Sequence, residues 1–161
     1  MGFKVTEDYY FFYGQDSVFS NWYKCEIKEY GIKFNCVEQY MMFNKALLFN
    51  DKIIMKRILN TDNPYRQKKL GRKVKGFDDD VWNRNKRRIV RRAVELKFRQ
   101  NHILHKTLMK TRNRLMVEAN QYDSIWGIGM SMEDENILDQ SQWKGMNLLG
   151  RIITDVRNSF K

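Results

Sequence analysis

The chain has 161 residues, of which 42% are hydrophobic, so it is long enough for one domain with a packed core, and its composition excludes a disordered protein. Its formal net charge of +11 exceeds what a small domain needs for solubility and favours a polyanionic partner or a phosphate-bearing substrate. A composition rich in Lys, Asn and Ile, of the kind that AT-rich coding DNA produces, explains the same charge equally well.

Cysteine content and hydropathy predict the compartment. Only Cys25 and Cys36 are present, which excludes a disulfide framework. The first residues are charged and lack the apolar stretch of a secretory signal, and no apolar run reaches the ~18 residues that span a membrane. We therefore expect a cytoplasmic protein that does not associate with membranes.

The first third of the chain is aromatic and alternating, which predicts short strands. These strands are expected over residues 9–13, 24–28 and 32–34. The Tyr30-Gly31 pair between the last two is typical of a tight turn and predicts that they form a hairpin.

The rest of the chain has mainly helical periodicity. Asn35 is expected to cap the first helix, with Glu38 at its third position, and Pro64 to open a later helix. The pattern predicts helices over residues 36–49, 51–59, 64–70, 79–100, 103–115 and 146–160, a strand over residues 115–119 and an irregular functional loop over residues 122–144. Together these elements predict an α+β fold, as a compact, mainly helical single domain of residues 1–161 with a few short N-terminal strands.

Glu38 and Lys45 are the first candidates for chemistry. Their spacing is nearly two helical turns, so both side chains point from one face of a helix, about 10 Å apart along its axis. In cleavage of an N-glycosidic bond, a carboxylate can stabilise the cationic sugar carbon, and a desolvated lysine can capture the opened sugar as a Schiff base. The alternative is that Glu38 only caps its helix and Lys45 is only solvated.

Three further segments combine aromatic, amide and glycine residues. The segment from Asp123 to Gly129 contains Trp126 and two glycines, which suits a sugar or base, or only a turn with a buried Trp. Trp143 and Asn147 precede the last helix, where Asn147 can bind a base edge or cap the helix. Asn21 and Trp22 can bind a base or sugar, although core packing of the aromatic residues explains them as well.

A basic segment, NKRRIVRR, runs from Asn85 to Arg92 within the longest expected helix. Its clustered arginines can bind nucleic-acid phosphates or form the solvated face of an ordinary amphipathic helix. His102 and His105 have no acidic or cysteine partners at a known metal-binding spacing, so we expect no metal site and no cofactor.

Taken in chain order, these segments resemble the NADAR, or YbiA-like, family. The resemblance spans almost the whole chain, and it is the combination of matching stretches that makes it specific. The stretches are FSNWY at residues 19–23, FNCVEQYMMFNKALLF at 34–49, LGRKVKGFDDDVW at 70–82, KFRQN at 97–101, EANQYDSIWGIG at 118–129 and WKGMNLLGRIITDVR at 143–157.

The resemblance implies an N-glycosidase, a hydrolase acting on N-glycosyl bonds. Some members act on phosphoribosylamino-pyrimidine intermediates of riboflavin synthesis, and others remove ADP-ribose from guanine in nucleic acid, reversing ADP-ribosylation. It implies Glu38 and Lys45 as the catalytic pair, with Lys45 in covalent or proton-transfer chemistry and Glu38 in acid–base and orienting roles. It also implies that a phosphorylated substrate is bound by Asn21, Trp22, Lys68, Arg72, Trp82, Asp123, Trp126, Gly127, Trp143 and Asn147.

This chain departs from the family pattern at Cys36, where serine is frequent, and at Asn44, where glutamine is common. Neither change removes a candidate catalytic group, but both leave the substrate open. The alternative from another functional class is a non-catalytic module that binds ADP-ribose, NAD or nucleic acid through the same aromatic and basic side chains.

Overall fold

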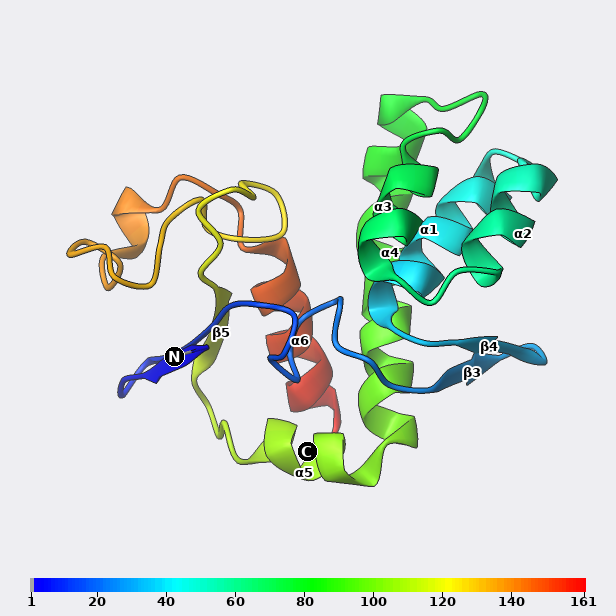
Figure 1. The fold of residues 1–161 in the computed structure, drawn as a ribbon. Coiled ribbons are helices and arrows are strands. Elements are labelled where there is room, and N and C mark those ends of the chain that lie inside the picture. The colour runs from blue at the N-terminus through cyan, green and yellow to red at the C-terminus, as the bar shows by residue number, and fades with distance from the viewer. Residues whose placement is uncertain (1) are drawn as a thin grey trace. The chain divides into compact units, whose positions relative to one another are not determined.

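The computed structural model describes residues 2–161, and the chain divides into two compact units (Figure 1). We call residues 1–20 and 103–161 the sheet unit and Asn21–His102 the helical unit. The secondary structure confirms the expected fold class, a mainly helical α+β protein with short strands.

The sheet unit is built on three short strands. Strand β2 (Tyr9–Phe12) lies in the middle, antiparallel to β1 (Phe3–Val5) and parallel to β5 (Leu115–Glu118). Helix α6 (Leu148–Ser159) packs against β5. Because β2 and β5 are parallel and about 100 residues apart, a long crossover must connect them.

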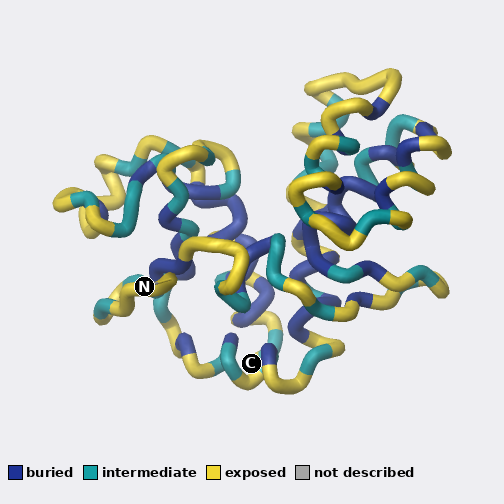
Figure 2. The backbone as a smooth tube through the Cα atoms, viewed as in Figure 1, coloured by how far each residue is buried: buried dark blue, intermediate teal, exposed yellow. Residues whose placement is uncertain are grey.

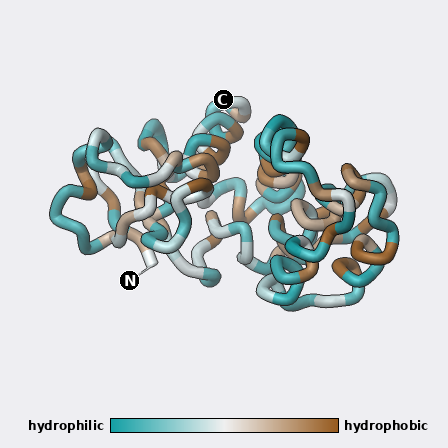
Figure 3. Tube along the Cα trace, turned by 90° about the horizontal axis from the view of Figure 1, so that it is seen from above, coloured by the Kyte–Doolittle hydropathy of each residue, from teal (hydrophilic) through white to brown (hydrophobic). Residues whose placement is uncertain are grey.

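The core of the sheet unit joins the strands to the loop that follows β5. Its buried residues are Phe11, Val117, Ala119, Ile128, Met130 and Ile137. Figure 2 shows the corresponding buried stretches of backbone, and in Figure 3 the helix leading to the C-terminus, α6, alternates between hydrophobic and hydrophilic residues. The loop of residues 119–147 contains one short 3-10 helix, Gln140–Gln142, and is otherwise irregular, as expected.

The helical unit begins with the expected hairpin, in which β3 (Ile27–Glu29) pairs antiparallel with β4 (Ile32–Phe34). Strand β3 covers Ile27–Glu29 rather than the predicted residues 24–28. Its turn residues Tyr30 and Gly31 have φ angles of 49° and 76°. Two successive positive φ angles match the twist of a two-residue hairpin turn. Helix α1 (Val37–Leu48) then forms the centre of the unit, packed against α2 (Lys52–Leu59), α3 (Pro64–Gly71) and α4 (Asp79–Gln100).

The cap of α1 differs from the prediction. Cys36, not Asn35, is the N-cap, and its Sγ accepts a hydrogen bond from the backbone N–H of Gln39 at 3.4 Å. Gln39, rather than Glu38, is the third residue of the helix, and its side chain accepts a hydrogen bond from the N–H of Asn35, the residue before the cap, at 2.7 Å. Glu38 is thereby not required for capping.

Two other expectations needed correction. Helix α5 (His102–Met109) ends earlier than residue 115, because Arg112 adopts a positive φ of 58° and turns the chain into β5. Strand β1 was not predicted, since its three residues are all exposed and carry no inward-facing alternation. No helix within residues 2–161 is both long and apolar enough to cross a membrane.

Candidate active site

Glu38 lies in the first turn of α1 and is only 3% exposed. Its backbone N–H donates a hydrogen bond to the carbonyl oxygen of Asn21 at 2.9 Å, which ties the segment before the hairpin to the start of α1. Asn21 is 7% exposed, and its side-chain Oδ1 has no hydrogen-bond partner. Because buried polar atoms are nearly always hydrogen-bonded, the Asn21 Oδ1 atom is unusual in that the fold gives it no donor.

Lys45 lies in the last turn of α1, half-buried among aromatic side chains. Its Nζ is 4.3 Å from the ring centroid of Phe77 and 5.5 Å from that of Trp82. Burial lowers the pKa of Lys45, against the opposing effects of the negative charges of Asp79 and Glu38. A partly desolvated amine is deprotonated more readily than an ordinary lysine, as a nucleophilic or proton-transferring lysine requires.

Two further cations lie in the same unit. The Nζ of Lys68, on α3, is 5.9 Å from the ring centroid of Trp22. Arg72 follows α3 as its C-cap, and its positive charge lowers the pKa of Lys45, so the guanidinium lies within electrostatic range of that amine. These are the cations expected to meet a phosphate group.

The helical unit therefore holds seven of the predicted site residues: Asn21, Trp22, Glu38, Lys45, Lys68, Arg72 and Trp82. Sequence reasoning missed Phe77, whose ring contacts the Lys45 amine, and Asp79, whose negative charge raises the pKa of that amine. Both belong to the GFDDDVW stretch, where Asp79 was taken only as a helix start. The feature of the sequence that could have identified Phe77 is its position as an aromatic residue directly after Gly76.

The turn after β5 contains three other candidates. The Oδ1 of Asp123 accepts hydrogen bonds from the backbone N–H groups of Ile125, at 2.9 Å, and Trp126, at 2.8 Å. A Cβ atom at Gly127 would lie 2.9 Å from the carbonyl oxygens of Asp123 and Glu118. Glycine is therefore required here by the close approach of protein backbone, and the turn presents the half-buried Trp126.

Asn147 and Trp143 have structural contacts that the sequence did not reveal. Asn147 is fully buried, its Oδ1 accepts from the N–H of Glu118 at 3.0 Å, and its Nδ2 donates to the carbonyl of Met116 at 2.9 Å. With both amide atoms bonded to β5, the Asn147 side chain makes no capping hydrogen bond to α6, and substrate binding by Asn147 stays a prediction.

Trp143 is likewise engaged within the sheet unit. Its indole N–H donates to the carbonyl of Ile137 at 2.8 Å, and its ring packs edge-on against Tyr9 at 5.7 Å between centroids. The ring also packs against the hydrophobic core. Support of the loop is thus the role that its contacts favour over direct substrate binding.

The basic segment lies on α4, with Ile89 and Val90 buried and its arginines exposed. Arg84, Arg88 and Arg91 share one helical face, whereas Arg92 is paired with Glu29 at 2.7 Å. The helical unit carries 21 Lys and Arg against 9 Asp and Glu, a net charge of +12, and the sheet unit carries 9 against 10, a net charge of −1. The excess positive charge therefore belongs to the helical unit.

No group of three or more His, Cys, Asp or Glu side chains in the described part of the chain is arranged to hold a metal ion.

With this geometry in view, the NADAR domain family matches residues 10–161, and the chain belongs to that family. The match crosses both units. Among relatives, the mimivirus protein named N-glycosidase R617 is 38% identical over 163 residues, covering 94% of this chain and 96% of that protein.

Two other similarities bear on function and fold. A riboflavin biosynthesis protein of Vibrio vulnificus is 25% identical, covering 98% of this chain but 40% of that longer protein. The NMR structure of Escherichia coli YbiA matches with a TM-score of 0.77 and 24% identity, covering 99% of this chain and 89% of that one. This structural match confirms the expected YbiA-like fold.

Proposed function

We propose that this NADAR protein hydrolyses the N-glycosidic bond between a phosphorylated ribosyl or ADP-ribosyl group and a nucleobase. The enzyme class, a hydrolase acting on N-glycosyl bonds, follows from membership of the family together with a relative that carries the name N-glycosidase. The observation that carries the proposal in this chain is a buried carboxylate, Glu38, and a partly desolvated amine, Lys45, on the same helix.

In the proposed reaction, the bond between the anomeric carbon and the base nitrogen breaks and water is consumed. Glu38 stabilises the positive charge that develops on the sugar and orients the reacting groups. Lys45 either donates a proton to the leaving nitrogen or, as the free amine, captures the anomeric carbon before water releases it. In both routes the hydroxyl of water ends on the sugar and the base leaves with a proton.

Substrate contacts are proposed from the same surroundings. The buried Oδ1 of Asn21 accepts from a sugar hydroxyl, which would supply its missing hydrogen bond. Trp22 and Trp82 offer ring faces to the base or sugar, and Lys68 and Arg72 hold phosphate oxygens. Asp123, Trp126 and Gly127 form a second substrate-facing segment, and Trp143 and Asn147 support it.

For the substrate itself, we favour ADP-ribosylated guanine in nucleic acid, with the phosphoribosylamino-pyrimidines of riboflavin synthesis close behind. The +12 charge of the helical unit and the exposed arginines of α4 support a polyanion, which would dock along residues 85–92. The similarity to a riboflavin biosynthesis protein supports the smaller substrate. Either substrate is consistent with action in the cytoplasm and requires no cofactor in this scheme.

A paired turnover assay tests the proposal. The protein is incubated with an ADP-ribosylated guanine oligonucleotide and, separately, with a phosphoribosylamino-pyrimidine, and release of the base or sugar is followed by mass. We expect cleavage of the first. Cleavage of only the second compound would identify the phosphoribosylamino-pyrimidine as the substrate. Saturable binding of ADP-ribose, NAD or nucleic acid, with no product from either compound, would mean that the protein is a binding module and not an enzyme.

A further inference from the structure

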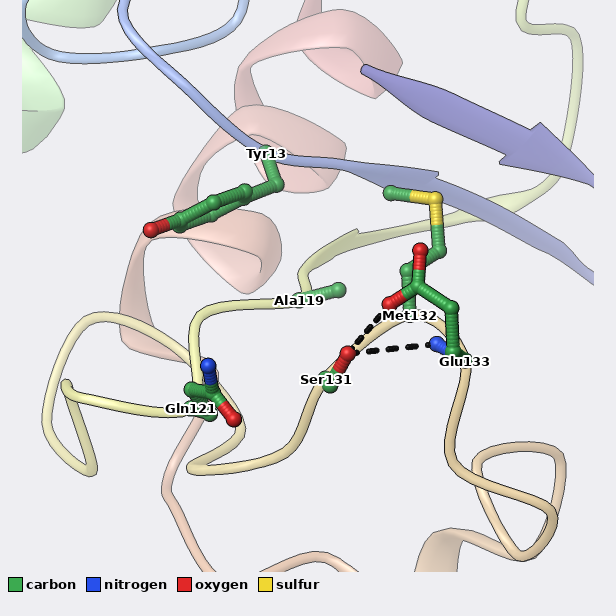
Figure 4. Close-up of a pocket in the computed structure, with 6 residues that line it drawn as sticks. All are labelled: Tyr13, Ala119, Gln121, Ser131, Met132 and Glu133. Carbon is green, nitrogen blue, oxygen red and sulfur yellow. Dashed lines mark hydrogen bonds between the residues drawn. The ribbon is translucent and has the colours of Figure 1, made fainter. Parts of the chain in front are cut away.

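A cavity lies in the sheet unit, lined by residues that the catalytic scheme does not use. Its volume is about 190 Å³, and its lining residues are Tyr13, Ala119, Gln121, Ser131, Met132 and Glu133. Figure 4 shows Tyr13 on one side and residues 131–133 on the other, with Ala119 between them. Sites that enclose a drug-sized ligand have about 300 Å³ or more, so this cavity fits a single ring system rather than a whole nucleotide.

The walls of the cavity suit a flat ring. Tyr13 is 43% exposed although it is aromatic, which leaves ring surface available for stacking. Met132, opposite, packs against the hydrophobic core on one side and contributes a flexible, polarisable side chain to the cavity. Aromatic and thioether surfaces together favour a planar ring over a flexible sugar or an aliphatic chain.

Polar groups at the rim of the cavity determine which kind of ring system it can bind. Gln121 contributes an exposed amide, which has both donor and acceptor atoms. The Ser131 hydroxyl donates to Glu133 Oε2, and this hydrogen bond lowers the pKa of the Glu133 carboxyl, which is therefore ionised at neutral pH. Glu133 is the only charged residue of the lining, so a phosphate is disfavoured inside and a hydrogen-bond donor is favoured.

We propose that this cavity binds an amino-bearing nucleobase, such as adenine, with its ring stacked on Tyr13 and its exocyclic amino group donating to Glu133. Binding of an amino-bearing nucleobase by this cavity goes beyond the proposed function and does not depend on it.

The first test is calorimetric titration of the intact protein with adenosine and with inosine, which lacks the exocyclic amino group. We expect saturable binding of adenosine, weakened about tenfold for inosine through loss of the bond to a charged acceptor. Glu133→Gln should reduce this preference. Tyr13→Ala should weaken adenosine binding about tenfold, and Tyr13→Phe should retain it, because stacking needs only the ring.

Tyr65→Ala is the matched control, since Tyr65 is an exposed tyrosine in the helical unit. Absence of adenosine binding, or adenosine binding that Tyr13→Ala leaves unchanged, would overturn the site. Adenosine binding that depends on Tyr13 in a protein without turnover would retain the site and reject the proposed catalysis.

Discussion

The candidate site residues of the helical unit and those of the sheet unit differ in what their polar side chains do. In the helical unit, Glu38 is buried, Lys45 is half-buried with a pKa lowered by burial, and Asn21 has a buried Oδ1 atom with no hydrogen-bond partner. In the sheet unit, the side chains of Asp123, Trp143 and Asn147 form hydrogen bonds with backbone groups.

This contrast separates two kinds of polar residue that look alike in a sequence. A polar group with all its partners inside the fold stabilises the fold, whereas one that is desolvated without a full set of partners is held at a cost in stability. The net charges of +12 and −1 sharpen the same division, because the excess positive charge lies in the helical unit. The comparison predicts that variants of Glu38 and Lys45 lose activity and that a variant of Asn147 loses stability.

The largest effect is expected from the catalytic pair. Glu38→Gln and Lys45→Met should each lower kcat by about 100-fold or more, because acid–base groups typically contribute 10²- to 10⁴-fold. Thermal unfolding should change little. Lys56→Met, an exposed lysine on the neighbouring α2, is the control and should keep full turnover. If both catalytic variants retain turnover, the assignment of the pair is wrong.

A pH-dependent stability effect is expected from Lys97, which is 1% exposed in α4. Burial lowers its pKa from 10.5 to about 8, so the unfolded chain binds this proton more tightly than the folded one. The free energy of unfolding should therefore rise between pH 8 and pH 10.5, by about 3 kcal/mol from this group. Urea unfolding of Lys97→Met should show a correspondingly flatter rise, and an identical pH dependence in both proteins would contradict the prediction.

Asn147→Ala tests the supporting role of the sheet unit. The change leaves the buried N–H of Glu118 and the carbonyl of Met116 without their present partner, which should lower the free energy of unfolding by about 2 kcal/mol or more. Chemical denaturation measures this loss. Activity per folded molecule should fall less than in the Glu38 and Lys45 variants. A stable but inactive Asn147→Ala protein would indicate that Asn147 binds the substrate.

The smallest expected effect concerns the exposed face of α4. Combined Arg84→Ala, Arg88→Ala and Arg91→Ala should weaken binding of an ADP-ribosylated oligonucleotide about tenfold at moderate salt and reduce the slope of log K against log salt by ~2–3. Turnover of a phosphoribosyl-pyrimidine should not change. An equal loss for both substrates would mean that these arginines support the fold, and no loss for either would remove nucleic acid from the proposal.

Local sequence determined most of the helices and the turn of the hairpin, but not the end of α5 or the bounds of β3. Residues 79–100 and 32–34 form the predicted elements with the predicted bounds, because periodicity, the Asp78 cap and the Tyr30-Gly31 turn act within a few residues. The family resemblance, carried by the order of short motifs, was confirmed over residues 10–161. Glu38 and Lys45 were candidates from helical spacing alone.

Tertiary structure decided what local sequence does not contain. The parallel pairing of β2 with β5 joins strands about 100 residues apart, and no local pattern specifies such a partner. The contact of Phe77 with the Lys45 amine and the bonds of Asn147 to β5 likewise arise from distant segments. A buried polar side chain finds hydrogen-bond partners only if packing brings backbone groups to it. The structure is therefore needed to distinguish Asn21, whose Oδ1 atom has no partner, from Asn147, whose amide oxygen and nitrogen are both hydrogen-bonded.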